Sequence, residues 1–346
     1  MNKSEKVLVT GGTGFVGKHI ILQLLQKGYE VRTTMRSLDK KDQLLDTLRA
    51  NGISSFEKLS FVAAELTKDD NWEEAMQDCH YVLSVASPVF FDIPKDENEA
   101  IRPAVEGIKR VLKFAKQAGV KRVVMTSNFG AVGFSQFDTS RNTTEADWTN
   151  PNEKGLSIYE KSKTLAEKAA WEFIHKEGAG LEFATINPVA IYGPSLGGHV
   201  SGSFHLLQNL LNGSMKPVPN IPLNVVDVRD VADLHIRAMV TPKANGQRFI
   251  ATADGEITLP EIASLLKDKF PNVSQKVSTK KVPDWVLKLA ANFNHQAKEG
   301  ALLLKVNRKV SNDKARNILG WKPMATQEEI IQSGVNSLIN HNLLNH

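Results

Sequence analysis

Tyr159 and Lys163 are the two side chains in this sequence whose types and spacing most clearly suggest chemistry. They stand four residues apart in an apolar-periodic segment, so a helix would place them on one face. A free phenol has a pKa of about 10, and a nearby ammonium is expected to lower it toward the neutral range. Such a tyrosine can give a proton to a carbonyl oxygen as hydride reaches the carbon. The lysine can hold a ribose, which would fix a hydride donor beside the tyrosine.

A glycine-rich turn near the start of the chain predicts the site for that donor. A β-branched run leads into Gly11, Gly14 and Gly17, and an amphipathic helix follows at once. Gly11 can take a positive φ, Gly14 leaves room for a pyrophosphate, and Gly17 lets the helix lie against the sheet. The strand before and the helix after favour dinucleotide binding over a plain tight turn. The same turn supplies Thr13, Phe15 and Val16 as candidate cofactor contacts.

Strand-like and helix-like segments alternate through the first half of the chain. Helical spacing is clearest at Val105, Ile108, Val111, Leu112 and Ala115. The alternation predicts an α/β fold, a Rossmann-type doubly wound parallel sheet with ligands at the carboxyl ends of the strands. The predicted strands cover residues 6–10, 30–35, 59–64, 81–86 and 122–127.

The end of the second predicted strand bears on which cofactor is bound. An enzyme selecting NAD usually has an acid there, whereas this chain has Arg36, Ser37 and Lys40. A guanidinium can pair with a 2′-phosphate in a forked geometry, and Lys40 adds a second positive charge. We therefore expect NADP(H) rather than NAD(H). The alternative interpretation is a solvated basic turn.

The ends of the third and fourth strands supply further candidate cofactor contacts. Glu65 and Leu66 follow the third strand, at a position suited to the adenine. Small residues that let a backbone pass close to a cofactor follow the fourth, namely Val85, Ala86 and Ser87. Phe90 and Phe91 come next and are candidates for an apolar wall near the reacting carbon or for a lid.

Taken together, these motifs resemble the extended short-chain dehydrogenase/reductases, in particular the group of dihydroflavonol, cinnamoyl-CoA and yeast-type methylglyoxal/aldehyde reductases. The resemblance covers nearly the whole chain and is carried by residues 85–88, 159–170, 187–194, 226–232 and 314–323. It implies that Pro188 and Val189 line the nicotinamide carboxamide, with Thr126 and Ile191 among the other cofactor contacts. It also implies two lobes. Residues 1–194 plus about 223–254 would bind NADP, and about 195–222 plus 255–346 would form a smaller substrate-binding lobe.

Two positions depart from that family's pattern. Asn128 stands where the family has a serine that hydrogen-bonds the substrate oxygen. An amide NH₂ can donate to a developing oxyanion as a hydroxyl does, so Asn128 can keep the role, or Ser127 can take it. Gly133 stands where the plant dihydroflavonol reductases read a flavonoid hydroxyl with an amide, so a flavonoid-specific pocket is not expected.

The leading hypothesis is an NADPH-dependent oxidoreductase that reduces an aldehyde or ketone, with Tyr159 as general acid. One alternative is a sugar-nucleotide epimerase or dehydratase, which would keep bound NAD and is disfavoured by Arg36. Another is a non-catalytic NADP(H)-binding redox sensor, which the presence of both Tyr159 and Lys163 disfavours.

Composition sets the remaining expectations. The 346 residues carry a formal net charge of +5 without any basic block, so we expect a small-molecule carbonyl substrate and no nucleic-acid partner. The one cysteine, Cys79, and the absence of an apolar run of about 18 residues favour a cytoplasmic protein without a membrane segment. The dispersed histidines predict no metal site. A monomer and a homodimer remain equally open.

Overall fold

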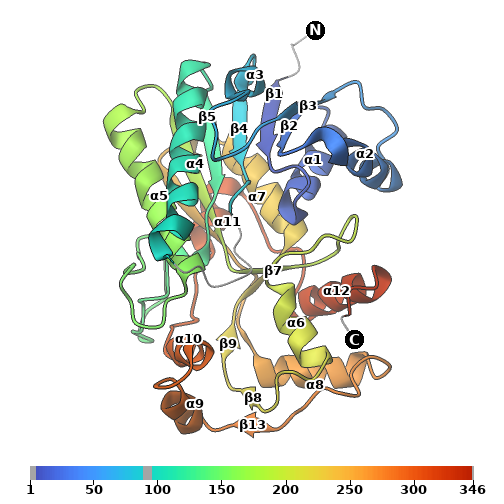
Figure 1. The fold of residues 1–346 in the computed structure, drawn as a ribbon, viewed down its shortest axis with the longest axis vertical. Helices are drawn as coiled ribbons and strands as arrows, with labels where there is room; N and C mark the ends of the chain where they lie inside the picture. The colour runs from blue at the N-terminus through green and yellow to red at the C-terminus, as the bar shows by residue number, and fades with distance from the viewer. Residues whose placement is uncertain (1–4, 89–95, 345–346) are drawn as a thin grey trace.

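The structure is a computed structural model and describes residues 5–88 and 96–344. Phe90 and Phe91, expected as a wall or a lid, lie outside the described residues. Figure 1 shows a large upper layer built around a sheet and a lower layer of short strands and helices. Among the described residues, no helix is both long and apolar enough to cross a membrane.

The central sheet has seven strands, all parallel, in the order β11-β6-β5-β4-β1-β2-β3. The predicted parallel, doubly wound sheet is therefore confirmed. The strands are β1 (Lys6–Thr10), β2 (Glu30–Met35), β3 (Leu59–Ala63), β4 (Tyr81–Ser84), β5 (Arg122–Thr126), β6 (Glu182–Pro188) and β11 (Gln247–Ala251). The last two were not among the predicted strands and extend the sheet beyond β5.

Helices cover both faces of this sheet (Figure 1). On one face lie α1 (Phe15–Gln26), α2 (Lys41–Ala50) and α7 (Val228–Val240), and on the other α3 (Trp72–Met76), α4 (Glu97–Gln117) and α5 (Ile158–Glu177). In β1, Val7 and Val9 pack toward α1, whereas Leu8 packs toward α4, and all three are fully buried. Because successive side chains of a strand point to opposite faces, a sheet covered on both faces needs continuous apolar strands.

The lower layer adjoins the carboxyl edge of the sheet (Figure 1). Its strands pair as β7 (Ala190–Tyr192) with β10 (Val225–Asp227), β9 (Pro222–Leu223) with β12 (Ile257–Thr258), and β8 (Val218–Pro219) with β13 (Lys281–Val282). Its helices are α6 (Phe204–Leu211), α8 (Leu259–Lys269), α9 (Asp284–Ala290), α10 (His295–Leu303) and α12 (Gln327–Asn340). α11 (Asp313–Leu319) instead packs on α7 and β11. The short 3-10 turns are η1 (Leu38–Lys40), η2 (Phe129–Ala131) and η3 (Pro242–Ala244).

Candidate active site

The start of α5 positions the tyrosine and lysine as a pair. Ser157 caps the helix, its hydroxyl accepting a hydrogen bond from the Glu160 backbone amide at 3.3 Å. Lys163 Nζ lies 5.8 Å from the centroid of the Tyr159 ring. The structure thus brings the two side chains together on one helical face, as their spacing predicts.

The pKa of the tyrosine moves in the direction opposite to the one expected. Burial, together with the nearby Glu160 carboxyl, raises the pKa of Tyr159 to about 12, against a hydrogen bond with the Asn128 side chain that lowers it. The expectation that this pKa is lowered toward the neutral range was wrong. The cost of removing the charged phenolate from water is the largest effect on the pKa.

Lys163 is almost fully buried, and burial lowers the pKa of its ammonium to about 8, with Glu167 acting in the opposite direction. The lysine borders a small cavity between α4, α5 and the ends of β4 and β5. The lining includes five residues expected at the cofactor, namely Leu66, Ala86, Ser87, Thr126 and Lys163. The carboxyl ends of the strands therefore bring these expected contacts together.

Asn128 and Ser127, the two candidate donors to a substrate oxygen, point in different directions. The Asn128 side chain hydrogen-bonds Tyr159, and its Oδ1 accepts from the Gly130 amide at 2.5 Å. Ser127 is 2% exposed, and its hydroxyl donates to the carboxylate of Glu167 in the interior. The structure therefore places Asn128, and not the hydroxyl of Ser127, beside the phenol.

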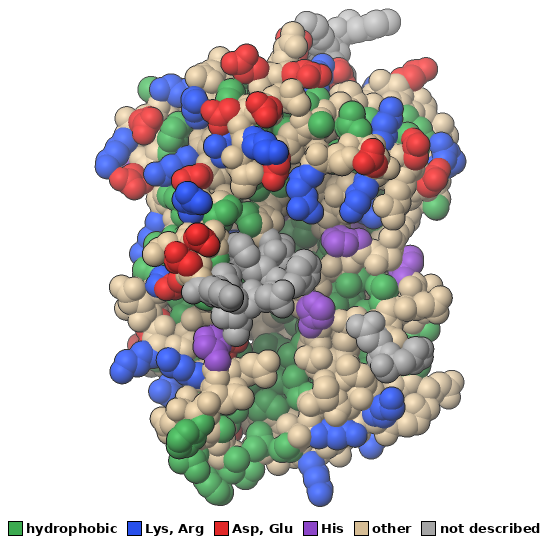
Figure 2. Space-filling view, in the orientation of Figure 1, with side chains coloured by type: hydrophobic (Ala, Val, Ile, Leu, Met, Phe, Trp, Pro, Cys, Tyr) green, Lys and Arg blue, Asp and Glu red, His purple; other side chains and the backbone are tan. Residues whose placement is uncertain are grey.

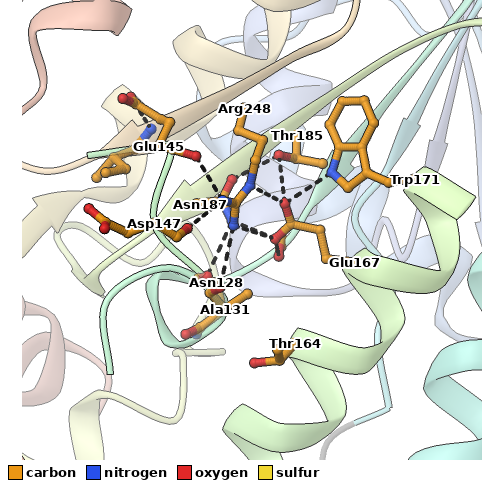
Figure 3. A network of polar contacts seen from close by, with 12 residues as sticks. Asn128, Ala131, Glu145, Asp147, Thr164, Glu167, Trp171, Thr185, Asn187 and Arg248 are labelled. Carbon is orange, nitrogen blue, oxygen red and sulfur yellow. Dashed lines mark hydrogen bonds and ion pairs between the residues drawn. The ribbon is translucent and has the colours of Figure 1, made fainter. Parts of the chain in front are cut away.

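The sequence analysis did not predict a buried polar network that joins α5, β6 and β11 (Figure 3). Its centre is Glu167, one helical turn beyond Lys163. The carboxylate accepts hydrogen bonds from Arg248 Nε at 2.6 Å and from Asn187 Nδ2 at 2.7 Å. Thr185 and Trp171 also donate to it, each at 3.2 Å. The spacing of Glu167 from Lys163 was the only signal in the sequence that could have pointed to this network.

The glycine turn has the shape that a pyrophosphate requires. Gly11 has φ +72°, and a Cβ there would lie 3.0 Å from the Cα of Ala86. A Cβ on Gly17 would lie 2.4 Å from the Gly11 carbonyl oxygen. Gly14 caps α1 without any side-chain hydrogen bond, so the first amides of the helix are left for an anion. These features fit a dinucleotide phosphate.

Thr10 fixes this turn to the neighbouring strand end, a role that the sequence analysis missed. Its hydroxyl oxygen accepts hydrogen bonds from the Val85 and Ala86 amides, both at 2.9 Å. Among the turn's other expected contacts, Val16 is buried, Thr13 is partly exposed, and the Phe15 ring meets Phe204 of α6 edge-on at 5.4 Å. The turn is therefore packed against both the sheet and the lower layer.

Basic side chains gather where β2 ends. Arg36, Ser37 and Lys40 are exposed, and the Ser37 hydroxyl donates to Asp39 at 2.6 Å. Lys18 in α1 is buried, and burial together with the charge of Lys40 lowers its pKa. Figure 2 shows lysine and arginine side chains interspersed with acidic ones over the upper layer, and histidines at mid-height, below them.

The remaining predicted contacts lie at other strand ends. Glu65 is close enough to Arg36 for that charge to lower its carboxyl pKa, after the larger effects of Thr67 and Lys68. The Thr126 hydroxyl is hydrogen-bonded to His235 at 2.6 Å and so is directed into α7.

At the nicotinamide side predicted by the resemblance, Pro188 ends β6 and the Val189 amide donates to the Ala251 carbonyl at 3.1 Å. Ile191 lies in β7 and pairs with Val226. These residues therefore line up along the carboxyl edge of the sheet.

A parallel sheet of this order, an open helix N-terminus and a paired tyrosine and lysine define a nucleotide-dependent oxidoreductase. The chain belongs to the 3-beta hydroxysteroid dehydrogenase/isomerase family, whose match spans residues 8–253. It is 33% identical over 301 residues to a ketoreductase of Aspergillus niger, covering 81% of this chain and 87% of the relative. It is 34% identical over 272 residues to dihydroflavonol 4-reductase of Hordeum vulgare, covering 77% of this chain and 75% of the relative.

Solved structures agree with this assignment. The crystal structure of yeast methylglyoxal/isovaleraldehyde reductase complexed with NADPH superposes with a TM-score of 0.80 at 27% identity, covering 98% of this chain and 100% of that chain. The resemblance to the dihydroflavonol and methylglyoxal reductase group is therefore confirmed.

Proposed function

We propose that this protein is an NADPH-dependent carbonyl reductase in which Tyr159 protonates the carbonyl oxygen of an aldehyde or ketone. The observation that carries the proposal is the arrangement of three side chains at the carboxyl edge of the sheet. Tyr159 and Lys163 share a face of α5, and the Asn128 amide hydrogen-bonds the phenol.

The cofactor site follows from the residues at the strand ends. Gly11, Gly14 and Gly17 leave the N-terminus of α1 open to the pyrophosphate. In this proposal Arg36 and Lys40 bind the 2′-phosphate, and Lys163 holds the nicotinamide ribose. NADPH, when bound, supplies the hydride. The membership of the chain in its family and the NADPH in the yeast neighbour support this choice of cofactor.

The ionisation of Tyr159 suits reduction. With a pKa raised to about 12, the phenol is protonated at neutral pH and ready to act as an acid. Asn128 stabilises the charge that develops on the carbonyl oxygen, since its amide hydrogen-bonds the same phenol. The positive charge of Lys163 favours the phenolate that is left after proton transfer.

In this proposal residues from about 195–222 and 255–346 form the lobe that selects the substrate. The single cysteine, buried with its thiol directed to the Ala75 carbonyl, suits a reducing compartment, and we propose the cytoplasm. The oligomeric state in this proposal is a monomer or a homodimer.

The experiment is a cofactor oxidation assay across a panel of aldehydes, ketones and dicarbonyls, with NADPH and NADH run in parallel. We expect turnover with NADPH and much less with NADH. Tight NADPH binding without turnover on any carbonyl would instead support a redox sensor. Purified protein that carries bound NAD would support an epimerase or dehydratase.

A further inference from the structure

Arg308 is a buried arginine that forms no ion pair within the described residues, although its guanidinium lies over two phenylalanine rings. The residue is 7% exposed, and its Nε has no hydrogen-bond partner. Within residues 5–88 and 96–344, no hydrogen bond or ion pair to its guanidinium is found. A guanidinium removed from water without compensation is costly, and buried charges are usually paired or bound to something. Burial lowers the pKa of Arg308 to about 10, so the group is still charged at neutral pH.

A second unpartnered polar group lies beside Arg308. Asn224 is 2% exposed, and its Nδ2 donates to the Arg308 carbonyl at 3.1 Å and to the Gly255 carbonyl at 2.9 Å. Its Oδ1 is buried and accepts no hydrogen bond. The two residues thus meet through the backbone of Arg308, and each keeps one buried side-chain atom, Arg308 Nε and Asn224 Oδ1, without a hydrogen-bond partner in the described protein.

These groups adjoin the residues proposed to act on the carbonyl. The Arg308 guanidinium carbon lies 5.9 Å from the centroid of the Phe129 ring and 5.5 Å from that of Phe134. Phe129 directly follows Asn128. The charge of Arg308 also acts on Glu160, which directly follows Tyr159. Arg308 thus lies close to residues that adjoin both Asn128 and Tyr159 in the sequence.

The two rings form an apolar wall around the guanidinium. A Cβ on Gly133 would lie 2.4 Å from the Phe129 ring, so this ring fills the space next to Gly133. The rings meet edge-on at 6.0 Å between their centroids. In such low-dielectric surroundings a charge-assisted hydrogen bond is stronger than in water.

We propose that the guanidinium of Arg308 binds a carboxylate of the substrate, so that this enzyme reduces carbonyl compounds that carry a carboxylate. The inference rests on the proposed reductase function. A carboxylate is the planar acceptor that matches a guanidinium fork.

Two acids, Glu256 and Glu160, act on the charge of Arg308 and would oppose such a substrate. Burial and then the charge of Glu299 raise the pKa of Glu160 to about 7, against the effect of Arg308. The charged groups that face this carboxyl are thus Glu299 and Arg308, together with the ionisable phenol of Tyr159. Below neutral pH the Glu160 carboxyl is mostly protonated, which leaves the positive charge of Arg308 to act on the ligand.

The test compares two aldehydes that differ only in charge, 4-formylbenzoate and its methyl ester, at saturating NADPH. In the natural protein we expect kcat/KM to be at least about tenfold higher for the acid. Arg308→Gln should lower kcat/KM for the acid by about 10- to 100-fold and change that for the ester by less than about twofold. Arg308→Lys keeps the charge but not the forked geometry, so its kcat/KM for the acid should lie between those of the natural protein and Arg308→Gln.

Lys305→Gln is the matched control, since this nearby lysine is exposed. It should leave both substrates unchanged. Equal kcat/KM for acid and ester in the natural protein would overturn the inference, as would an equal loss on both in Arg308→Gln.

If Arg308→Gln folds poorly, the proposal is tested instead by measuring the inhibition of ester reduction in the natural protein. Competitive inhibition by benzoate but not by benzamide is expected, and equal inhibition by the two overturns the inference. Failure to oxidise NADPH with any carbonyl would instead refute the proposed function itself.

Discussion

Glu167 and Arg248 form a buried ion pair, with 2.6 Å between Arg248 Nε and Glu167 Oε1, and the glutamate is fully enclosed. The pair joins α5 to β11, which lie 81 residues apart in the sequence. Asn187, which donates to Glu167, also donates to the Asn128 carbonyl at 3.3 Å (Figure 3). Through Asn187, the ion pair therefore helps to fix the backbone of Asn128. Its glutamate also acts on the ammonium of Lys163. Asn128 and Lys163 both belong to the proposed catalytic site.

Replacing Glu167 by glutamine should affect both stability and the pH profile. Breaking one half of a buried ion pair costs about 3–5 kcal/mol, measurable by urea unfolding. Because the charge of Glu167 raises the pKa of Lys163, its loss should shift that pKa further below about 8. The loss of activity at alkaline pH should then begin at lower pH. Glu172→Gln, on the exposed side of α5, should change neither quantity.

If Glu167→Gln lowers the free energy of unfolding but does not change the pH profile of activity, this glutamate has only a structural role. A double variant, Glu167→Gln with Arg248→Met, should recover part of the lost stability, since no unpaired charge is left in the core.

Tyr159→Phe should lower kcat by about 10²- to 10⁴-fold, the contribution typical of a general acid. The Kd of NADPH, measured by fluorescence titration, should stay within about twofold, since the ring still packs beside Lys163. Tyr29→Phe, on a partly buried tyrosine of the core, should leave kcat unchanged. Turnover close to that of the natural protein in Tyr159→Phe would contradict the proposed mechanism.

Gly17→Ala should disrupt the cofactor site. The added Cβ would lie 2.4 Å from the carbonyl oxygen of Gly11, closer than real contacts allow, so the turn must move. We expect NADPH binding, measured by calorimetry, to weaken by at least about 10-fold, a loss of about 1.4 kcal/mol or more. Gly202→Ala is the control, because a Cβ there meets no atom within 4 Å. Equal affinity in both variants would show that the close approach at Gly17 is dispensable.

Arg36→Gln should weaken NADPH binding by about 10-fold or more and leave NADH binding nearly unchanged. The reason is that a charge-assisted bond to the 2′-phosphate is worth about 1.5–3 kcal/mol, and NADH has no such phosphate. Arg49→Gln, an exposed arginine at the other end of α2, tests for general charge effects. Equal losses for the two cofactors in Arg36→Gln would contradict a phosphate contact.

The sequence was informative wherever a function depends on residues close together in the chain. The turn at Gly11 to Gly17 and the Tyr159–Lys163 pair are local patterns, and both could be found from spacing and flanking elements. Strands β1 to β5 were also predictable within one or two residues, because each is a short segment rich in β-branched and apolar residues between helical segments.

Contacts between distant parts of the chain could not be predicted in this way. Nothing in the sequence around Arg248 or Arg308 shows that one is paired with Glu167 while the other is left without a partner. The direction of the Tyr159 pKa shift depends on burial, which spacing does not show. For Ser127 and Asn128, adjacent in sequence, alternation along the chain sends one side chain inward and the other to the site.

His235 gives a prediction about stability and pH. It is fully buried, with Nε2 2.6 Å from the Thr126 hydroxyl and Nδ1 2.7 Å from the Val231 carbonyl. Burial lowers the pKa of His235 from 6.5 to about 4. In the unfolded chain the imidazole would take up a proton near pH 6.5, so between about pH 6.5 and 4 the unfolded state binds more protons than the folded state. This stabilising contribution is present at neutral pH and is lost as the pH falls through that window.

His235→Gln removes this titration and should flatten the acid side of the stability curve. The difference in the free energy of unfolding between natural protein and variant, measured by urea unfolding, should change by up to about 3 kcal/mol from pH 7 to 4. Taking the difference cancels carboxyls such as Asp230, whose raised pKa of about 6 acts in the opposite direction. His175→Gln, on the exposed end of α5, should give a constant difference. A constant difference for His235→Gln as well would mean that this histidine does not titrate differently in the folded and unfolded states.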